Sequence, residues 1–199
     1  MSTAPRDKLA ALRHALEEYE SGAGGGELFD HEKDAAMAKV RNRALLLLDH
    51  RARSRHELKT RLLALDFDPE IVAEVIADLV RLGLVDDESF AKEWVRQRHA
   101  ARGKSRWVLD RELQQKGIGA EERSTALSQV SEESEEEQAR VLAFKKARSI
   151  KAVPADRGDF DKQLRRVVGV LARRGYSQVA SLRIAREALE ERISQLEDD

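Results

Sequence analysis

Apolar residues recur at helical spacing along most of this chain of 199 residues. The clearest stripe lies between positions 71 and 80, and its members are Ile71, Val72, Val75, Ile76, Leu79 and Val80. Because these positions fall on one side of a helix, the stripe predicts a helix that is buried along that side. Similar patterns predict helices over about 43–50, 54–66, 69–82, 87–101, 105–116, 120–130, 134–150, 160–174 and 177–196. No stretch alternates as a strand would, so the chain is predicted to be all-α.

Three of the predicted helices end in the same way. A leucine is followed five positions later by a large apolar residue in the segments 62–67 (LLALDF), 113–118 (LQQKGI) and 171–176 (LARRGY). The residue just before that apolar position is Asp66, Gly117 or Gly175. Glycine readily adopts the left-handed conformation that ends a helix, and aspartate is one of the few other residues that tolerates it. We therefore predict a left-handed helix stop in each segment.

The spacing of the three stops indicates an internal repeat. The stops are 51 and 58 residues apart, and each is followed by residues that favour a new helix, namely Asp68–Pro69, Gly119 and Ser177. This regularity predicts an elongated array of three tandem three-helix repeats, over residues 37–86, 87–130 and 131–199. Residues 1–36 carry four basic and eight acidic side chains and contain the segment SGAGGG, which predicts a flexible acidic N-terminal arm.

Two capping boxes are predicted inside the repeats. Ser54 with Glu57, and Ser134 with Glu137, have the spacing at which a serine and a glutamate satisfy the first N–H groups of a helix. These pairs predict that one helix begins after Ser54 and another after Ser134.

The composition limits the classes of protein to which the chain can belong. Charged residues make up 37% of the sequence and aromatic residues only 5%, which suits helices with wide solvated faces and thin cores. The absence of cysteine excludes disulfides and thiolate metal sites. No apolar run approaches the ~18 residues of a membrane-spanning helix, and the N-terminus has no hydrophobic signal core. We therefore expect a cytoplasmic protein that does not enter a membrane.

No arrangement of residues points to catalysis. His50 and His56 are not at the spacing of paired metal ligands on a helix, and the other three histidines are isolated. The glycines in residues 22–26 follow no strand and lack the lysine of a phosphate-binding loop. The carboxylates alternate with Lys and Arg at helical spacing, as on a solvated face. We expect no enzyme activity, no metal and no cofactor.

Residues 92–116 are the best candidate for a binding surface. They carry eight basic and three acidic side chains, and both tryptophans lie among them. Basic side chains beside an aromatic ring can neutralise phosphates and stack on bases. The candidate binding residues are Arg96, Arg98, Arg102, Lys104, Arg106, Trp107, Arg111 and Lys116. Among them we favour Arg102, Lys104 and Arg106, at the loop between two predicted helices.

Other interpretations apply to this region and to the short turns between the predicted helices. Long basic side chains can simply cover apolar surface on a solvated helix, and Trp94 shares a face with Phe90 and Val95 that predicts packing in a core. A helix-turn-helix that reads DNA bases is disfavoured by charge. Its second helix would begin Pro69–Glu70 and carry further carboxylates, which phosphates repel.

Several segments together resemble the RecX family of bacterial regulatory proteins, which act on the RecA recombinase. The similarity rests on residues 54–58 (SRHEL), 75–86 (VIADLVRLGLVD), 90–96 (FAKEWVR), 103–104 (GK), 112–118 (ELQQKGI) and 174–176 (RGY). It covers about residues 38–196. One departure is Asp66, which stands where a glycine is usual in the family.

The resemblance implies a regulator that lies in the groove of the RecA–single-stranded DNA filament. Such a protein would bridge RecA protomers and suppress ATPase, strand exchange and coprotease activity. We expect it to act as a monomer whose partners are the RecA filament and single-stranded DNA, with double-stranded DNA as a further candidate. Two alternatives stay open: a nucleic-acid-binding protein that acts without a filament, and a purely structural helical adaptor.

Overall fold

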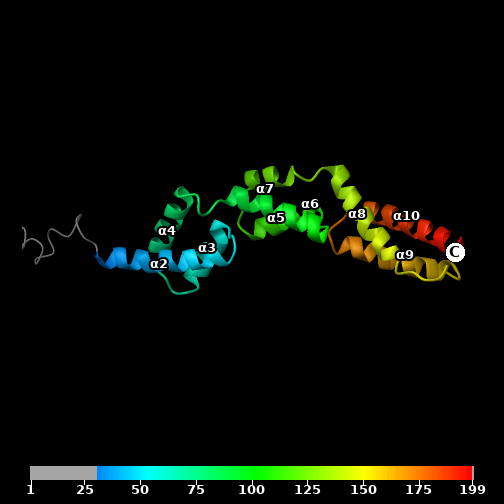
Figure 1. The fold of residues 1–199 in the computed structure, drawn as a ribbon, viewed down its shortest axis with the longest axis horizontal. Helices are drawn as coiled ribbons and strands as arrows, with labels where there is room; N and C mark the ends of the chain where they lie inside the picture. The colour runs from blue at the N-terminus through cyan, green and yellow to red at the C-terminus, as the bar shows by residue number, and fades with distance from the viewer. Residues whose placement is uncertain (1–30, 199) are drawn as a thin grey trace, which may run out of the picture.

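The structure is a computed structural model that describes residues 31–198. In this range the chain forms nine helices and no strand: α2 (His31–His50), α3 (Arg55–Leu63), α4 (Pro69–Arg81), α5 (Asp87–Arg102), α6 (Arg106–Gln115), α7 (Ala120–Leu127), α8 (Glu132–Ala147), α9 (Arg157–Ala172) and α10 (Gln178–Glu197). Figure 1 shows that they follow one another as three groups of three along the long axis of the molecule. The predicted all-α, elongated array of three-helix repeats is confirmed.

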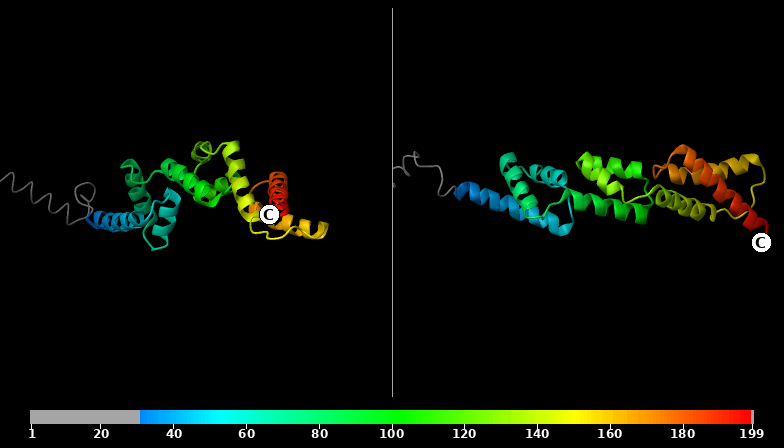
Figure 2. Two further views of the ribbon diagram at one scale, coloured as in Figure 1. Left: turned by 45° about the vertical axis from the view of Figure 1, so that its right-hand side comes forward. Right: turned by 90° about the horizontal axis from the view of Figure 1, so that it is seen from above.

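Each group of three helices has a hydrophobic core of its own. We call α2–α4 the first unit, α5–α7 the second unit and α8–α10 the third unit. The largest fully buried side chains are divided among them: Leu58, Leu62 and Leu79 in the first unit, Leu109 and Leu113 in the second, and Leu171, Ile184 and Leu189 in the third. The views of Figure 2 show the units in series rather than around a common centre. Neighbouring units must therefore be held together by specific contacts at their junctions.

The predicted helix stops are confirmed. Asp66, Gly117 and Gly175 have positive φ angles of 59°, 72° and 86°. The Ser54 hydroxyl accepts the N–H of Glu57 at 3.1 Å, as expected for the first half of a capping box. Local signals in the sequence thus decide where these helices start and stop.

Two predicted helix starts were wrong. The first helix begins at His31, so residues 31–36, which the sequence assigned to the acidic arm, belong to α2. Its early turns are stabilised by acidic residues near the N-terminus and by an ion pair of 2.8 Å between Lys33 and Glu74 of α4. In α8 the cap is Ser131, whose hydroxyl accepts the N–H of Ser134 at 3.1 Å. The rest of the predicted arm lies outside the described residues.

The two junctions between units are built from equivalent contacts. The first residue of α3, Arg55, donates its backbone N–H to Asp87 of the next unit at 2.8 Å. The first residue of α6, Arg106, donates its backbone N–H to Glu135 of the next unit at 2.8 Å. A carboxylate at a helix N-terminus satisfies a free N–H group and interacts favourably with the helix dipole. The middle helix of each of the first two units is therefore capped by the unit that follows it.

A second contact at each junction joins the capping serine of one unit to the helix stop of the next. The Ser54 hydroxyl donates to the backbone oxygen of Lys116 at 2.6 Å. The Ser105 backbone N–H donates to the backbone oxygen of Arg174 at 3.0 Å. Both contacts join the start of the middle helix of one unit to the end of the middle helix of the next unit. The sequence repeat therefore produces the same geometry at both junctions.

The glycines at these junctions are required for two reasons. A Cβ at Gly117 would lie 2.3 Å from the Cβ of His56, and one at Gly175 would lie 2.2 Å from a methyl carbon of Val108. These positions therefore need both a left-handed backbone and the absence of a side chain. Asp66 is the corresponding stop in the first unit, where it is exposed and no earlier unit packs on it in the described range. This explains why a residue with a side chain is tolerated there.

Candidate functional site

The structure separates the eight candidate binding residues into two groups. Three of them lie around Trp94 and its hydrogen-bond partner Glu112 and are mostly covered, with about a quarter of each side chain exposed: Arg98, Lys104 and Lys116. The others lie on the α5 surface or around the start of α6: Arg96, Arg102, Arg106, Trp107 and Arg111. The eight residues therefore do not form one continuous surface of free charges.

Trp94 is a packing residue, as predicted. Its ring stacks on Phe90 with 5.6 Å between ring centroids and packs against the core of the second unit. The guanidinium carbon of Arg98 lies 3.7 Å from the centroid of the Trp94 ring, and the ammonium of Lys116 lies 4.9 Å from it. Both cations therefore cover one aromatic ring through cation–π contacts.

Glu112 neutralises part of the same cluster. Its carboxylate accepts the indole N–H of Trp94 at 3.0 Å, lies 3.6 Å from Nε of Arg98 and forms an ion pair with Lys104. For these side chains the alternative interpretation, basic residues that cover apolar surface, agrees with the geometry. Arg98 and Lys104 are consequently committed to contacts inside the protein.

Lys116 is committed in the same way, through Glu57 of the first unit. Glu57 accepts hydrogen bonds from Lys116 and from Arg51, the latter with 3.0 Å between Nη2 and Oε1. Burial raises the pKa of Glu57, whereas the hydrogen bonds from Arg51 and Lys116 lower it more strongly, so that the pKa is about 2. Glu57 is thus a charged link across the first junction.

The side chains around Trp107 are available to a partner. Trp107 is 60% exposed, which is high for the largest apolar side chain, and the guanidinium carbon of Arg111 lies 5.0 Å from its ring centroid. The guanidinium groups of Arg102 and Arg106 make no ion pair or hydrogen bond within residues 31–198. Arg96 is also exposed, but it forms an ion pair of 2.6 Å with Glu93. We call Trp107, Arg102, Arg106 and Arg111 the Trp107 surface.

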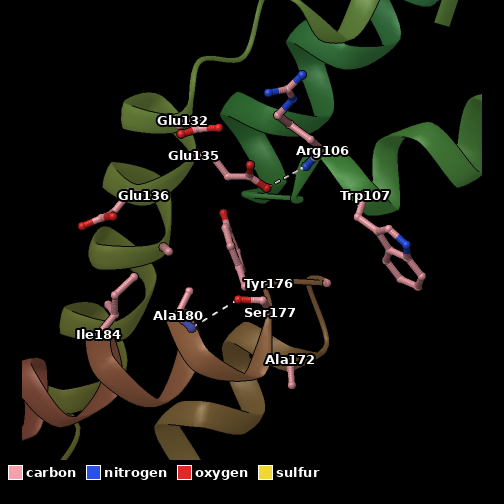
Figure 3. A pocket seen from close by; sticks show the side chains of 12 residues that line it. Arg106, Trp107, Glu132, Glu135, Glu136, Ala172, Tyr176, Ser177, Ala180 and Ile184 are labelled. Atoms are coloured by element: carbon pink, nitrogen blue, oxygen red, sulfur yellow. Dashed lines mark hydrogen bonds between the residues drawn. The ribbon is translucent and has the colours of Figure 1, made fainter. Parts of the chain in front are cut away.

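A cleft of about 790 Å³ opens beside the Trp107 surface, between the second and third units. Figure 3 shows Arg106 and Trp107 on one side of it and the glutamates of α8 on the other. Tyr176 and Ile184 line it from the third unit. The cleft therefore combines an exposed aromatic ring, an acidic wall and an apolar floor.

Tyr176 is buried at the junction between the second and third units. Its hydroxyl donates to the backbone oxygen of Gly103 at 3.0 Å, and the residue is only 9% exposed. Burial and, to a smaller extent, the negative charge of Glu135 together raise the pKa of Tyr176 to about 12. The phenol is therefore a neutral hydrogen-bond donor near pH 7, with a structural role.

A second basic surface lies in the third unit and was not predicted. Residues 145–174 carry ten basic and three acidic side chains, a net charge of +7. The corresponding figure for residues 92–116 is +5. The Arg–Arg pairs at 165–166 and 173–174 were a sequence signal that could have located this surface.

Two features are absent from the described part of the chain. Between residues 31 and 198, no three His, Asp or Glu side chains converge on a point where a metal ion could bind. None of the helices in this range combines the length and the apolar character needed to cross a membrane.

Comparison with known proteins identifies relatives over almost the whole chain. The family descriptions that match are "RecX, first three-helix domain" over residues 41–79 and "RecX, second three-helix domain" over residues 86–127. Regulatory protein RecX of Corynebacterium efficiens is 58% identical over 193 residues, which cover 95% of this chain and 91% of that protein. Regulatory protein RecX of Streptomyces coelicolor is 40% identical over 155 residues, which cover 78% of this chain and 80% of that protein.

A solved structure has the same fold. The crystal structure of RecX from Lactobacillus salivarius matches with a TM-score of 0.62 at 23% sequence identity, covering 83% of this chain and 99% of that chain. The match supports the all-helical architecture described above.

Proposed function

The chain belongs to the RecX family of regulatory proteins, and from this we propose that it binds the RecA–single-stranded DNA filament. Bound in the filament groove, it inhibits the recombinase, ATPase and coprotease activities of RecA. The observation that carries the proposal is the 58% identity to a regulatory protein RecX over 193 residues. We place this role in DNA repair and recombination, including the SOS response, and in the cytoplasm, with the protein acting as a monomer.

The shape of the protein supports this proposal. Three units in series present a long surface, as repeat proteins do, and a helical polymer offers a long groove to such a surface. The hydrogen bonds at both junctions hold the units in a fixed order and spacing. One molecule can therefore contact successive RecA protomers and restrain their movement relative to one another.

We assign contact with the filament to the Trp107 surface. An exposed tryptophan beside arginines that form no ion pair within residues 31–198 suits either a phosphate group or an acidic protein surface. Among the residues favoured from sequence, Arg102 and Arg106 remain in this assignment. Lys104 does not, because its ion pair with Glu112 holds it inside the second unit.

The assignment can be tested by charge reversal. The test variant carries Arg102→Glu, Arg106→Glu and Arg111→Glu, and it should lose co-sedimentation with RecA filaments while keeping its circular dichroism spectrum. The matched control reverses exposed cations of the first unit that have no internal partner in residues 31–198: Lys39, Arg43 and Lys59. The control should sediment with filaments as the unaltered protein does. Equal loss from both variants, or full binding by the test variant, would contradict the assignment.

The alternative is a nucleic-acid-binding protein that acts without a filament. The free basic side chains of the second and third units support it. Co-sedimentation at several salt concentrations, with and without RecA, separates the two functions. Binding that requires RecA supports filament regulation, whereas strong binding to bare DNA with a steep salt dependence supports the alternative.

A further inference from the structure

A hollow of about 440 Å³ lies at the first junction, with walls from two units. The loop between α2 and α3 supplies Arg51 and Arg53. The second unit supplies Phe90 and Trp94 of α5. Leu84, which precedes α5 and is 52% exposed, adds a further apolar wall. This hollow, which we call the Arg53 hollow, therefore has the size and the lining of a small-ligand site: mostly apolar walls with a few polar groups.

Arg53 has hydrogen-bond donors that the protein does not use. It is 9% exposed, and no other arginine or lysine in residues 31–198 is as deeply buried. Its Nε donates to the backbone oxygen of Leu47 at 3.0 Å, and the side chain makes no other hydrogen bond and no ion pair in that range. The one fully buried side-chain nitrogen or oxygen without a partner there is Oγ of Ser181, so Nη1 and Nη2 of Arg53 have access to solvent. These two nitrogens can bind a group in the Arg53 hollow, which Arg53 lines.

The charged groups around Arg53 do not neutralise it. Arg51 has the same sign, and Glu57 is already engaged by Arg51 and Lys116. Burial and then the positive charge of Arg51 lower the pKa of Arg53, and the negative charge of Glu57 offsets them only in part. A guanidinium nevertheless stays protonated at pH 7, and a buried cation without a counter-ion is unfavourable. An anion in the Arg53 hollow would relieve this penalty.

Two carboxylates of the second unit also line the Arg53 hollow, but both are held by other groups. Asp86 is the N-cap of α5 and accepts two backbone N–H groups of its first turn, at 2.9 and 3.1 Å. Glu93 pairs with Arg96 at 2.6 Å. Both carboxylates are exposed, and neither forms a hydrogen bond or ion pair with Arg53. The outer nitrogens of Arg53 are therefore left for a ligand.

Capping of α2 explains only one of the contacts that Arg53 can make. A cation near the C-terminus of a helix interacts favourably with the last carbonyl groups, and the bond to Leu47 is of this kind. That bond uses one of the five N–H groups of the guanidinium. The remaining pair, Nη1 and Nη2, has the planar geometry that matches the two oxygens of a carboxylate.

We propose that the Arg53 hollow binds an organic carboxylate with an apolar body. The carboxylate oxygens accept hydrogen bonds from Nη1 and Nη2 of Arg53, and the apolar body packs against Leu84, Phe90 and Trp94. A phosphate fits less well, because its further charged oxygens would face apolar walls. Since the walls belong to two units, the bound ligand stabilises the first junction. The site is separate from the Trp107 surface and does not depend on the proposed function.

The fluorescence of Trp94 in the full chain tests the proposal. The chain has two tryptophans, so the substitution Trp107→Phe leaves Trp94 as the single reporter. Titration at constant pH and ionic strength with phenylacetate should give a saturable change, with a dissociation constant on the order of 1–10 mM for so small a ligand. Phenylacetamide lacks the charge and acetate lacks the apolar body. Both should bind at least about tenfold more weakly.

A second titration distinguishes the two sources of such a carboxylate. The blocked dipeptide acetyl-Phe-Glu-amide carries its one carboxylate on a side chain, as an acidic segment of a protein does. Saturation by phenylacetate assigns the site to a free organic acid. Saturation by the dipeptide alone assigns it to an acidic side chain of a partner protein. Either result upholds the proposal.

Substitutions at Arg53 connect the binding to the geometry. Arg53→Gln should weaken phenylacetate binding at least about tenfold, because it removes a charged hydrogen-bond donor. Arg53→Lys keeps the charge but not the paired donors, and it should weaken binding by a smaller factor. The matched control is Arg43→Gln on α2, which removes an exposed cation outside the hollow and should leave the affinity unchanged. Circular dichroism checks that each variant is folded.

Urea unfolding gives an independent measurement. At ten times its dissociation constant, phenylacetate should raise the folding equilibrium constant of the unaltered protein about tenfold, because it binds only the folded chain. The same concentration should leave the midpoint of Arg53→Gln nearly unchanged. If Arg53 only caps α2, Arg53→Gln lowers stability but phenylacetate shifts neither protein.

Four results would overturn the proposal: no saturable response to phenylacetate or to the dipeptide, equal affinity for phenylacetamide or acetate, unchanged affinity in folded Arg53→Gln, or equal loss in Arg43→Gln. None of them bears on RecA. Carboxylate binding by a protein that fails to inhibit RecA would uphold this proposal and contradict the proposed function alone.

Discussion

The junction geometry predicts unequal effects for alanine at two glycines that share a backbone conformation. Gly117 and Gly83 have φ angles of 72° and 70°. An added Cβ at Gly83 meets no atom within 4 Å, whereas one at Gly117 would lie 2.3 Å from the Cβ of His56. The backbone of α3 itself must shift to relieve that contact, because a Cβ has no freedom to move away. Comparing the two substitutions therefore separates two free-energy costs: that of a side chain on a left-handed backbone, and that of the steric contact at the first junction.

The magnitudes follow from these two costs. A side chain at a left-handed position costs about 1–2 kcal/mol, and overpacking a filled site adds about 1–3 kcal/mol. Gly83→Ala should thus lower the free energy of unfolding by about 1–2 kcal/mol, and Gly117→Ala by about 2–5 kcal/mol. Asp66→Gly should be neutral or stabilise by up to about 1 kcal/mol, because it removes a side chain from a left-handed position with no packing partner.

Urea unfolding followed by far-ultraviolet circular dichroism measures these differences. The shift in midpoint should be larger for Gly117→Ala than for Gly83→Ala. The transition of Gly117→Ala should also broaden, since a weakened junction lets the first unit unfold separately from the second. Equal losses for the two glycine variants would show that the close approach at the first junction does not contribute to stability, and the reasoning would fail.

Three further predictions concern the same junctions. Because the folded pKa of Glu57 is about 2, below its unfolded value, its stabilisation of roughly 2–3 kcal/mol is present above about pH 5 and is lost as the pH falls towards 2. Glu57→Gln should therefore flatten the acid decline in unfolding free energy, and Glu93→Gln, at an exposed ion pair, should not. Tyr176→Phe should cost about 1–2 kcal/mol in urea unfolding, because the backbone oxygen of Gly103 loses its buried donor. Asp87→Ala should cost about 1.5–3 kcal/mol in the same assay by uncapping α3, and an unchanged midpoint would contradict that role.

The fold was predictable because its signals are local. The left-handed stops at Asp66, Gly117 and Gly175, and the starts of the helices that follow them, each depend on a few neighbouring residues. The two wrong helix starts have a local cause as well. Residues 31–36 are acidic and alanine-rich, so the same residues fit a solvated arm or the first turns of a helix, and contact with α4 decides between them.

The candidate site was less predictable because free and neutralised cations look the same in a sequence. Lys104 is held by a carboxylate eight positions away, and Lys116 by Glu57, 59 positions away in another unit. A count of charges over residues 92–116 includes both as if they were available. The second basic surface could have been found from the arginine pairs at 165–166 and 173–174, but the absence of an ion pair for Arg165 and Arg173 within residues 31–198 is visible only in three dimensions.

The central claim is that the protein suppresses the RecA filament, and ATP hydrolysis by RecA on single-stranded DNA tests it most directly. The protein should inhibit hydrolysis by preformed filaments when it is present at fewer copies than RecA, because in the proposed function one elongated molecule contacts several protomers. The variant with Arg102→Glu, Arg106→Glu and Arg111→Glu should inhibit much less at equal concentration. If the unaltered protein leaves the hydrolysis rate unchanged even at equimolar concentration with RecA, the proposed function is contradicted.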